Sequence, residues 1–267
     1  MTRHIVTLTT DFGVRDNYVA AMKAVMLNIN PDLNVVDITH EIGRHDIMEA
    51  CFVIANTYHY FPKWSIHIVV VDPTVGSSRR PLVASINSHH FVAPDNGVLS
   101  GLYQDPEDIS VYEIQAEHYY LKPLSSTFQG RDIFAPVAAW LSKGVEIENF
   151  GEKIDDYVDL KLPVPVVDEE GHLQGEIIHA DSFGNLITNV TRAQFEDMLE
   201  EAVKHKFELK IGDVTLSDLK RFYAECEKGK PSALFGSTSQ LEVAAKQKSA
   251  SELLGLDKGA KFTLKFM

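Results

Sequence analysis

The sequence predicts an α/β protein with an N-terminal, mostly parallel, sandwich-type α/β domain and a smaller C-terminal β-barrel-like domain. From His4 to about Leu141, short β-branched runs alternate with helical patterns, which is typical of βαβ units. Periodicity then fades, and the run KLPVPVV places two prolines in an extended, linker-like segment. Short strands dominate the rest of the chain. We therefore expect domains at residues 1–165 and 166–267.

The N-terminal domain is expected to contain six strands and three helices. The strands are His4–Thr10, Leu33–Ile38, Ser65–Val71, Pro81–Asn87, His90–Ala93 and Val111–Ile114. The helices are Tyr18–Ile29, a segment that Asp46 caps and that ends before Pro62, and Gly130–Leu141. Asp16 or Asn17 is the expected N-cap of the first helix. Pro136 is tolerated in the third helix only with a kink.

The C-terminal domain is expected to be rich in short strands. These are Gly175–His179, Asn185–Asn189, Lys206–Ile211, Ser232–Phe235, Leu241–Val243 and Lys261–Phe266. One helix is expected over Arg192–Glu201.

Composition excludes several functional classes for this chain of 267 residues. The formal net charge is −13 and the basic residues are scattered, which argues against nucleic acid as a partner and favours a small molecule. No stretch has the roughly 20 apolar residues that a membrane helix needs, and the start lacks a signal-peptide pattern, so we expect no membrane association and a cytoplasmic location. Two distant cysteines, Cys51 in a helical pattern and Cys226 in a polar loop, exclude a disulfide framework.

Three predicted strands of the first domain end in an aspartate, at Asp11, Asp37 and Asp72. Ligands of open α/β sheets bind outside the carboxyl ends of the strands, so such carboxylates converge on one crevice. A single aspartate there is equally well explained as a turn former, and we assign Asp37 to that role. Asp11 opens the loop DFGVRDNY, in which Gly13 permits a tight turn, so this loop with Asp16 can wrap a polar ligand such as a ribose diol.

Asp72 gives the sharpest prediction. In VVVDPTVGSSRR, Pro73 and Gly76 turn the chain, and Arg79 begins the returning segment, so that the loop can bring Arg79 beside Asp72. The pair is either an ion pair that only staples the loop or a cleft carboxylate that orients a water molecule.

Two further loops have the residues of a ligand site. APDNGVL places Asp95 and Asn96 before Gly97 at a predicted helix start. DSFGNLITN places Asp181, Phe183 and Asn185 around a glycine between two strands. Phe183 can stack on a base while Asn185 contacts its edge, although a hairpin turn explains the same residues.

Signatures of metal and phosphate sites are missing from the sequence. There is no dinucleotide fingerprint or P-loop, and HEIGRH spaces its histidines unlike the zinc-protease helix, so we expect no metal and no cofactor. We interpret most histidines, including His89 and His90, as surface or satisfied structural residues.

Six motifs, in order, resemble those of the S-adenosylmethionine hydroxide adenosyltransferases, the adenosine-forming S-adenosylmethionine hydrolases related to fluorinase and chlorinase. They are TTDFGVRDNYV, VVVDPTVGSSRR, APDNGVLS, TFQGRDIFAP, DSFGNLITN and GSTSQLEVA. The resemblance implies an α/β domain, a barrel-like domain and a homotrimer that binds its ligand between subunits. It also implies attack of water on ribose C5′ of S-adenosylmethionine, giving adenosine and methionine without a cofactor.

The resemblance also implies residue roles. The position of Asp11 holds the ribose hydroxyls in that family, and those of Asp72 and Arg79 belong to its water-activating set. The positions that surround adenine match Phe183, Asn185 and Tyr223, and those at the methionine end match Asp181 and Ser237. Aspartate at 72 favours hydrolysis, because the halide-using relatives have tyrosine there.

This chain departs from the family pattern in two places. Gln129 stands where the family usually has histidine, and it can hydrogen-bond a water molecule but cannot accept a proton at neutral pH. In the tail, Gly236 and Ser239 replace the usual asparagine and glycine.

Three hypotheses therefore remain open. The first is a hydrolase that uses Asp72 and Arg79, with Gln129 orienting water. The second is a protein that binds adenosine or S-adenosylmethionine without turnover. The third is a Mg²⁺-dependent phosphohydrolase with Asp11, Asp37 and Asp72 as ligands.

Overall fold

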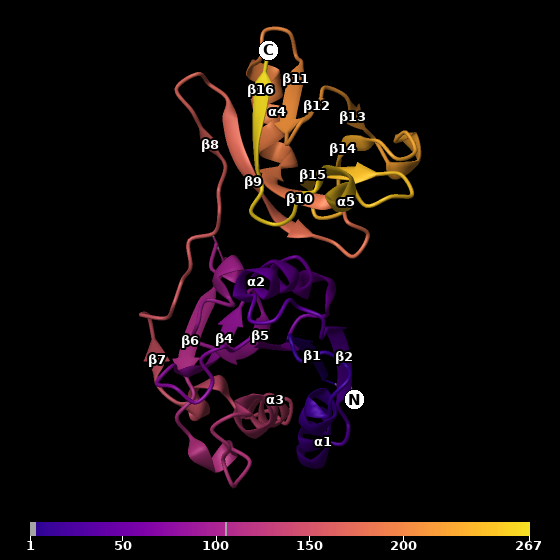
Figure 1. Cartoon of the computed structure of the whole chain (residues 1–267). Helices are drawn as coiled ribbons and strands as arrows, with labels where there is room; N and C mark the ends of the chain where they lie inside the picture. Colours follow the sequence, from indigo (N-terminus) through magenta and orange to yellow (C-terminus); the bar gives the residue numbers. More distant parts are fainter. Residues whose placement is uncertain (1–3, 105) are drawn as a thin grey trace. The chain divides into compact units, whose positions relative to one another are not determined.

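The computed structural model describes residues 4–104 and 106–267. The chain divides into two compact units, one ending at Lys161 and the other beginning at Leu162 (Figure 1). The division falls at the start of the proline-containing run in which the sequence loses its periodicity. Among the described residues, no helix has both the length and the apolar character that crossing a bilayer requires.

The first unit is built on a seven-stranded sheet with the order β2-β1-β3-β5-β4-β6-β7. The strands are β1 (Ile5–Thr10), β2 (Asn34–Thr39), β3 (Ile66–Val70), β4 (Pro81–Ile86), β5 (His89–Pro94), β6 (Ile109–Glu113) and β7 (Lys153–Ile154). Strands β2, β1, β3 and β5, which are neighbours in this order, pair in parallel. Strands β5, β4, β6 and β7, which continue the sheet in this order, pair in antiparallel fashion. The expectation of a mostly parallel sheet is therefore correct for one half only. The two residues between β4 and β5, Asn87 and Ser88, both have positive φ and form a hairpin turn that is too short for a parallel crossover.

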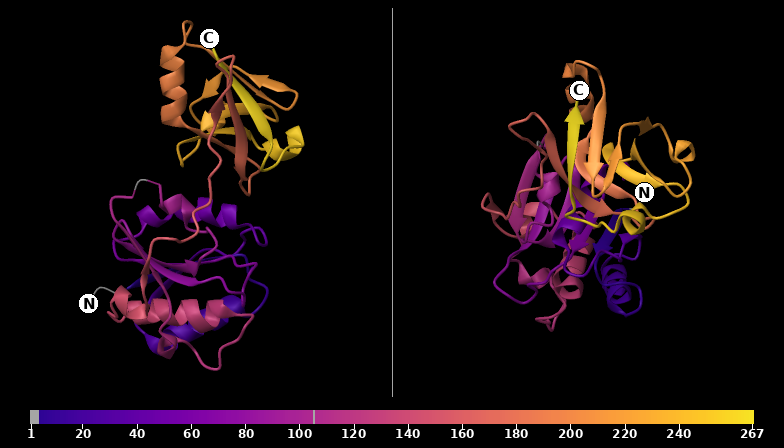
Figure 2. Two further views of the ribbon diagram at one scale, coloured as in Figure 1. Left: turned by 90° about the vertical axis from the view of Figure 1, so that its left-hand side faces the viewer. Right: turned by 45° about the horizontal axis from the view of Figure 1, so that its top comes forward.

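Helices cover both faces of this sheet (Figure 2). They are α1 (Tyr18–Ile29), α2 (Ile47–Ala55), α3 (Ala135–Leu141), the π-helix η4 (Gly130–Phe134) and the 3₁₀ turns η1 (Tyr58–Tyr60), η2 (Ser100–Leu102), η3 (Glu117–Tyr119) and η5 (Ile147–Phe150). Helices α1 and α3 pack on one face, in a core with Ile68 and Val70 of β3. Helix α2 packs on the other face, in a core with Val69 and Val71. The alternation of β3 between two cores explains why it is buried at every position.

One local expectation for this unit is confirmed and another is corrected. Asn17 is the N-cap of α1, as expected, although its side chain makes no capping hydrogen bond. Pro136 lies in the first turn of α3, directly after the π-helix that ends at Phe134, at a position where no amide donor is needed. Asp37 is not in a turn: it lies inside β2 and pairs with Lys23 at 2.6 Å.

The second unit is a nine-stranded mixed sheet that curls as a half-barrel. It remains open, with β12 and β13 at the ends of the path. The strands are β8 (Val166–Val167), β9 (Leu173–Ala180), β10 (Leu186–Thr191), β11 (Phe207–Ile211), β12 (Val214–Leu216), β13 (Leu219–Lys220), β14 (Pro231–Phe235), β15 (Gln240–Ala245) and β16 (Lys261–Phe266). The helices are α4 (Arg192–Glu201), α5 (Ala250–Leu254) and the 3₁₀ turn η6 (Tyr223–Glu225).

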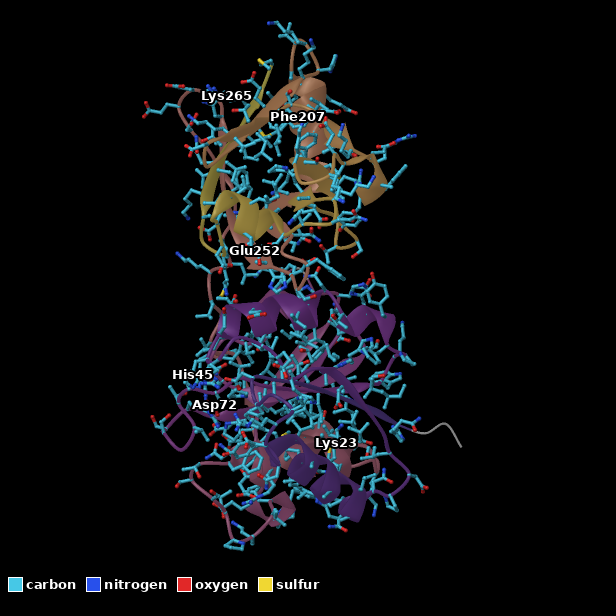
Figure 3. The ribbon with its side chains drawn as sticks, turned by 45° about the vertical axis from the view of Figure 1, so that its right-hand side comes forward. Lys23, His45, Asp72, Phe207, Glu252 and Lys265 are labelled. Atoms are coloured by element: carbon cyan, nitrogen blue, oxygen red, sulfur yellow. The ribbon has the colours of Figure 1, made fainter. Side chains whose placement is uncertain are left out.

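The curve of this sheet encloses an aromatic core. Phe207, labelled in Figure 3, packs edge-on against Phe195 of α4 at 5.0 Å. A capping box between Thr191 and Gln194 starts α4, so the sequence pattern there is directly reflected in the structure. Cys226 lies in a loop after η6, as expected, but its side chain is buried against Leu234 of β14.

A chain of buried histidines crosses the first sheet away from the aspartate loops. Thr7 Oγ1 and His67 Nδ1 are 2.8 Å apart, and His67 Nε2 and His89 Nδ1 are 3.3 Å apart. His90 Nδ1 is buried without a hydrogen-bond partner among the described residues. The interpretation of His89 as a satisfied structural residue is therefore confirmed, because it is buried and bonded to His67. It is wrong for His90, whose buried Nδ1 is unsatisfied among the described residues.

We predict that His67 makes the stability of the protein sensitive to acid. Burial, followed by the charges of His89 and His90, lowers the pKa of His67 to about 3, whereas an unfolded histidine titrates near about 6.5. Unfolding therefore takes up a proton between these values, and stability is lost as the pH falls from about 6.5 toward 3. In urea unfolding from pH 7 to pH 4, His67→Gln is expected to reduce the loss by roughly 1 kcal/mol per pH unit. An unchanged slope would contradict this, and His4→Gln, at an exposed position, is the control.

Candidate active site

The topology places Asp11 and Asp72 at one edge of the first sheet. Strands β1 and β3 are parallel neighbours, and Thr10 pairs with Val70. Asp11 directly follows β1, and Asp72 follows β3 after one further residue. The two carboxylates therefore leave adjacent strands at their carboxyl ends, which is where open α/β sheets bind ligands.

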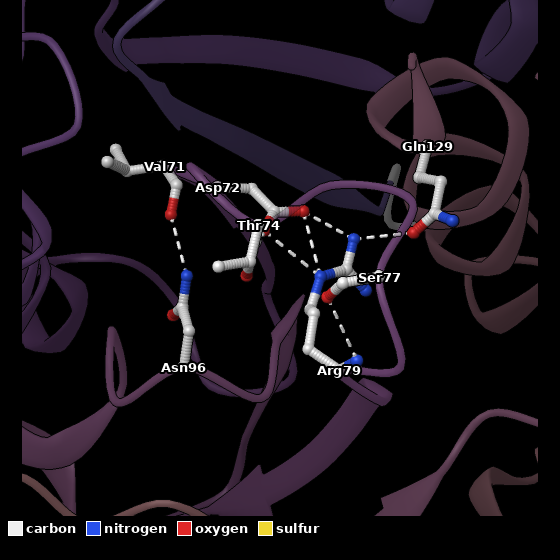
Figure 4. A network of polar contacts seen from close by, with 7 residues as sticks. All are labelled: Val71, Asp72, Thr74, Ser77, Arg79, Asn96 and Gln129. Carbon is white, nitrogen blue, oxygen red and sulfur yellow. Dashed lines mark hydrogen bonds and ion pairs between the residues drawn. The ribbon is translucent and has the colours of Figure 1, made fainter. Parts of the chain in front are cut away.

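Asp72 and Arg79 form an ion pair that is almost sealed from solvent. Arg79 Nε lies 3.0 Å from Asp72 Oδ1 and 2.9 Å from Oδ2, and Arg79 Nη2 also donates to Oδ2 (Figure 4). Their side chains are only 5% and 7% exposed, respectively. The structure thus brings together the two residues that the length of the loop predicts to be partners.

Gln129, the residue just before the π-helix, also belongs to this network. Its Oε1 accepts a hydrogen bond from Arg79 Nη2 at 2.5 Å. Because the amide oxygen is used in this way, the Nε2 group is left as a donor, and it makes no hydrogen bond with the described residues. Arg79 Nη1 is likewise buried without a partner in the part of the chain that the structure describes, and the guanidinium carbon lies 5.3 Å from the centre of the Phe134 ring. The network therefore offers two uncommitted donors.

The loop between Asp72 and Arg79 is held by its own polar groups and by Asn96. Thr74 Oγ1 donates to Asp72 Oδ1 at 3.3 Å, and Ser77 Oγ accepts from the Arg79 backbone at 3.3 Å. Asn96 Nδ2 donates to the carbonyl of Val71 at 2.9 Å, so Asn96 fixes the end of β3 behind the carboxylate (Figure 4). The expected helix start at Asn96 is wrong, since the next turn, η2, begins only at Ser100.

The Asp11 loop borders a cavity of about 410 Å³. Asp11 Oδ2 accepts a hydrogen bond from the backbone of His45 at 2.9 Å, which leaves the carboxylate with further acceptor capacity. Asp16 lines the same cavity, together with Arg15 and Arg44. The loop that the sequence predicts to wrap a polar ligand therefore surrounds a space of suitable size and polar character.

In the second unit, Asp181 and Asn185 close the hairpin between β9 and β10. Asp181 Oδ1 accepts from the backbones of Phe183 and Asn185 at 2.9 Å each, and Oδ2 accepts from Asn185 Nδ2 at 2.8 Å. The ring of Phe183 is 78% exposed. The turn interpretation thus accounts for Asp181, while the Phe183 ring is free to stack on a planar ligand.

Tyr223 is hydrogen-bonded to an acidic residue, Glu242, that the sequence did not indicate as part of the site. Its hydroxyl donates to Glu242 Oε1 at 2.5 Å, and Glu242 is only 4% exposed. Desolvation raises the pKa of Tyr223 above its ordinary value, and its hydrogen bond to Glu242 acts in the same direction. Ser237, in the turn between β14 and β15, is exposed. The available signal for Glu242 is its position as an acid within the apolar strand LEVAA.

The structure does not assemble the three carboxylates of the phosphohydrolase hypothesis. Asp37 lies within β2 and is paired with Lys23 and, at 3.0 Å, with His40. Among residues 4–104 and 106–267, no group of three or more histidine, cysteine or acidic side chains is arranged to hold a metal ion. The network of Asp72, Arg79 and Gln129 instead favours a reaction in which hydrogen bonds hold a small reactant in place.

Comparison with known families agrees with this geometry. The model of the SAM hydroxide adenosyltransferase N-terminal domain matches residues 6–151, and that of the C-terminal domain matches residues 175–263. The chain belongs to this family. It is 36% identical to an (R)-S-adenosyl-L-methionine hydrolase of Methanocaldococcus jannaschii, over 95% of this chain and 92% of the relative. It is 25% identical to a fluorinase of Nocardia brasiliensis, over 73% and 74% of the two chains. A crystal structure of a conserved protein from Thermotoga maritima superposes with a TM-score of 0.87 at 32% identity, covering 97% of this chain and 99% of that one.

Gly76 provides a test of how the Asp72 loop is held. It has a φ of +80°, and an added Cβ would lie 2.3 Å from the carbonyl oxygen of Ser126. We expect Gly76→Ala to lower the free energy of unfolding by more than the roughly 1–2 kcal/mol of left-handed strain alone. Gly144→Ala is the control, since Gly144 also has a positive φ but no atom within 4 Å of the added Cβ. Equal losses in urea unfolding would show that the contact with Ser126 is unimportant.

Proposed function

We propose that this protein hydrolyses S-adenosyl-L-methionine at ribose C5′, giving adenosine and L-methionine. The sealed network of Asp72, Arg79 and Gln129, at the sheet edge that also carries Asp11, is the observation that carries this proposal. Relatives that match most of the chain support it, because four of them, at 30–36% identity, are named (R)-S-adenosyl-L-methionine hydrolase.

The reaction requires a correctly positioned water molecule rather than a strong general acid or base. The oxygen of water bonds to C5′ while the C5′–S bond breaks, and the bonding electrons remain on sulfur. The sulfonium becomes a neutral thioether, which needs no general acid to leave, and one proton passes from water to solvent. Holding the water in line with the C5′–S bond supplies much of the possible rate enhancement.

The network contains the parts that such positioning requires. Asp72 accepts a hydrogen bond from the attacking water, and Arg79 fixes the carboxylate in one orientation. Gln129 holds Arg79 through Oε1 and directs its Nε2 donor to the oxygen of the water. Neither the amide of Gln129 nor the guanidinium of Arg79 can accept the proton that the water loses. Asp72 is therefore the group of this network that can accept it before it passes to solvent.

Other residues are proposed to bind the substrate. Asp11 holds the ribose hydroxyls and Asp16 contributes to the same cavity, whereas Asn96 acts by supporting β3. In the second unit, Phe183, Asn185 and Tyr223 contact adenine, and Asp181 and Ser237 contact the methionine end. We further infer a cytoplasmic homotrimer that binds its nucleoside substrate at subunit interfaces and uses no cofactor, on the basis of the family resemblance.

A second candidate function is binding of adenosine or S-adenosylmethionine without turnover. Gln129 favours it, because no histidine is available to assist the water. The two functions share their ligand contacts and differ in whether adenosine is released.

The deciding assay follows adenosine by chromatography during incubation with the R epimer of S-adenosyl-L-methionine. We expect release above the buffer blank, unaffected by a chelator, and a loss of about 10²-fold or more in Asp72→Asn, because an oriented charged group is removed. Asp37→Asn is the matched control and should retain the wild-type rate. Tight binding by calorimetry with no adenosine would establish the second candidate instead. Because removing one partner of a buried ion pair is destabilising, thermal unfolding must confirm that Asp72→Asn is folded.

The dependence of the rate on pH tests the role of Gln129. An amide does not titrate, so we expect the wild-type rate to show no inflection between about pH 6 and pH 8. Gln129→His is expected to introduce one there, since an unperturbed histidine titrates near about 6.5. Gln129→Leu, which lacks the Nε2 donor, should be slower at every pH. An inflection near neutrality in the wild type would show that a different titrating group assists the water.

A further inference from the structure

Asp132 is a fully buried carboxylate in the π-helix, three residues after Gln129. Its side chain is 0% exposed, and both of its oxygens accept hydrogen bonds. Arg131 donates from Nε to Oδ1 at 2.6 Å and from Nη2 to Oδ2 at 3.0 Å. The backbone of Ser125 donates to Oδ2 at 2.7 Å. A buried acid with a cation and a backbone donor is charge-compensated and holds both partners by strong hydrogen bonds.

These contacts anchor the segment from Leu121 to Phe128, which contains no helix or strand. The carbonyl of Asp132 accepts from the backbone of Leu121 at 2.9 Å, so Asp132 holds the start of the segment as well as Ser125. The end of the segment is held by the π-helix, because the backbones of Arg131 and Asp132 both donate to the carbonyl of Phe128 at 3.2 Å. An irregular segment has no hydrogen-bond ladder of its own, so its path depends on such contacts.

The anchored segment lies against the loop that carries Asp72. The carbonyl oxygen of Ser126 would be only 2.3 Å from a Cβ added to Gly76, which shows how closely the two backbones approach. Gln129 follows the segment directly, and its Oε1 accepts from Arg79 Nη2 at 2.5 Å. The position of the Gln129 amide therefore depends on the path of this segment.

The π-helix gives a second reason to connect Asp132 with the site. Such helices are rare and occur frequently at functional sites. This one begins at Gly130, directly after Gln129. The guanidinium of Arg131, which pairs with Asp132, also lies over the ring of Phe128, 5.3 Å from its centre. Arg131 thus joins Asp132 to the residue that precedes Gln129.

We propose that Asp132 is a positioning residue that fixes the Gln129 amide beside Arg79. This inference rests on the proposed function, in which that amide directs water to C5′. Because its side chain is fully buried, Asp132 acts through the segment that leads to Gln129. Its loss leaves Asp72 and Arg79 paired, so the substrate still binds while the water is less well oriented. A displacement of about 1 Å at such a group can lower a rate about 10²-fold.

The test is a double-mutant cycle between Asp132 and Gln129, measured as adenosine release by the full-length protein. We expect Asp132→Ala to lower kcat by about 10- to 100-fold with little change in KM. Asp132→Asn keeps the shape and one acceptor oxygen, and should lose only about 5-fold, because a neutral acceptor makes a weaker hydrogen bond. In the Gln129→Leu background, each change should alter kcat by no more than about 2-fold, since both residues act through the same contact.

A purely structural role of Asp132 predicts a different pattern. The losses would then be as large in the Gln129→Leu background as in the wild type, and this result would overturn the inference. Glu117→Gln is the matched control, because it removes an exposed ion pair with Lys122 of the same segment and should keep the wild-type kcat. If Asp132→Ala does not fold, the cycle is measured with Asp132→Asn, and an unchanged kcat in that folded variant overturns the inference equally.

A spectroscopic readout separates this inference from the proposed function. If the wild type releases no adenosine, the proposed function fails, but the side-chain amide of Gln129 can still be followed by NMR. Its signals are assigned by their absence in Gln129→Leu. We expect Asp132→Ala and Asp132→Asn to shift them, and Glu117→Gln to leave them in place. Unchanged signals in the Asp132 variants would rule out the positioning role, whether or not the protein is a hydrolase.

Discussion

The ion pair between Asp72 and Arg79 is the interaction on which the candidate active site depends. Both side chains are nearly sealed from solvent, so neither charge can be removed without leaving the other uncompensated. The loop that joins them must turn sharply, which Gly76 permits through its positive φ and its close approach to Ser126. Gln129 attaches the network to the π-helix. The geometry of three separate segments is therefore fixed by one guanidinium.

The same arrangement explains why binding groups remain available. Arg79 Nη1 is a buried nitrogen without a hydrogen-bond partner among the described residues. Folding alone would favour an apolar group or a partner at this position. Its persistence is understandable if ligand or water completes the site. In this account, the protein gives up some stability at Arg79 in order to recognise and orient its substrate.

The sequence predicted much of this site because local signals dominate there. A strand that ends in aspartate, followed by a turn of fixed length, placed Arg79 beside Asp72, and the β-branched runs located the central strands. Other features depend on tertiary context. Asp37 looked like a strand end because β2 continues only two residues beyond it. Glu242 looked like an ordinary polar position of an alternating strand, and only the segment carrying Tyr223 and Cys226 buries it.

The origin of the oxygen atom in the product tests the central claim most directly. The account holds that the Asp72 network directs water to C5′, so hydrolysis in ¹⁸O-labelled water should place the label on the 5′-hydroxyl of adenosine. Mass spectrometry of both products would show labelled adenosine and unlabelled methionine. Unlabelled adenosine, or a label in a fragment derived from the amino-acid chain, would mean that the attack occurs elsewhere and would contradict the account.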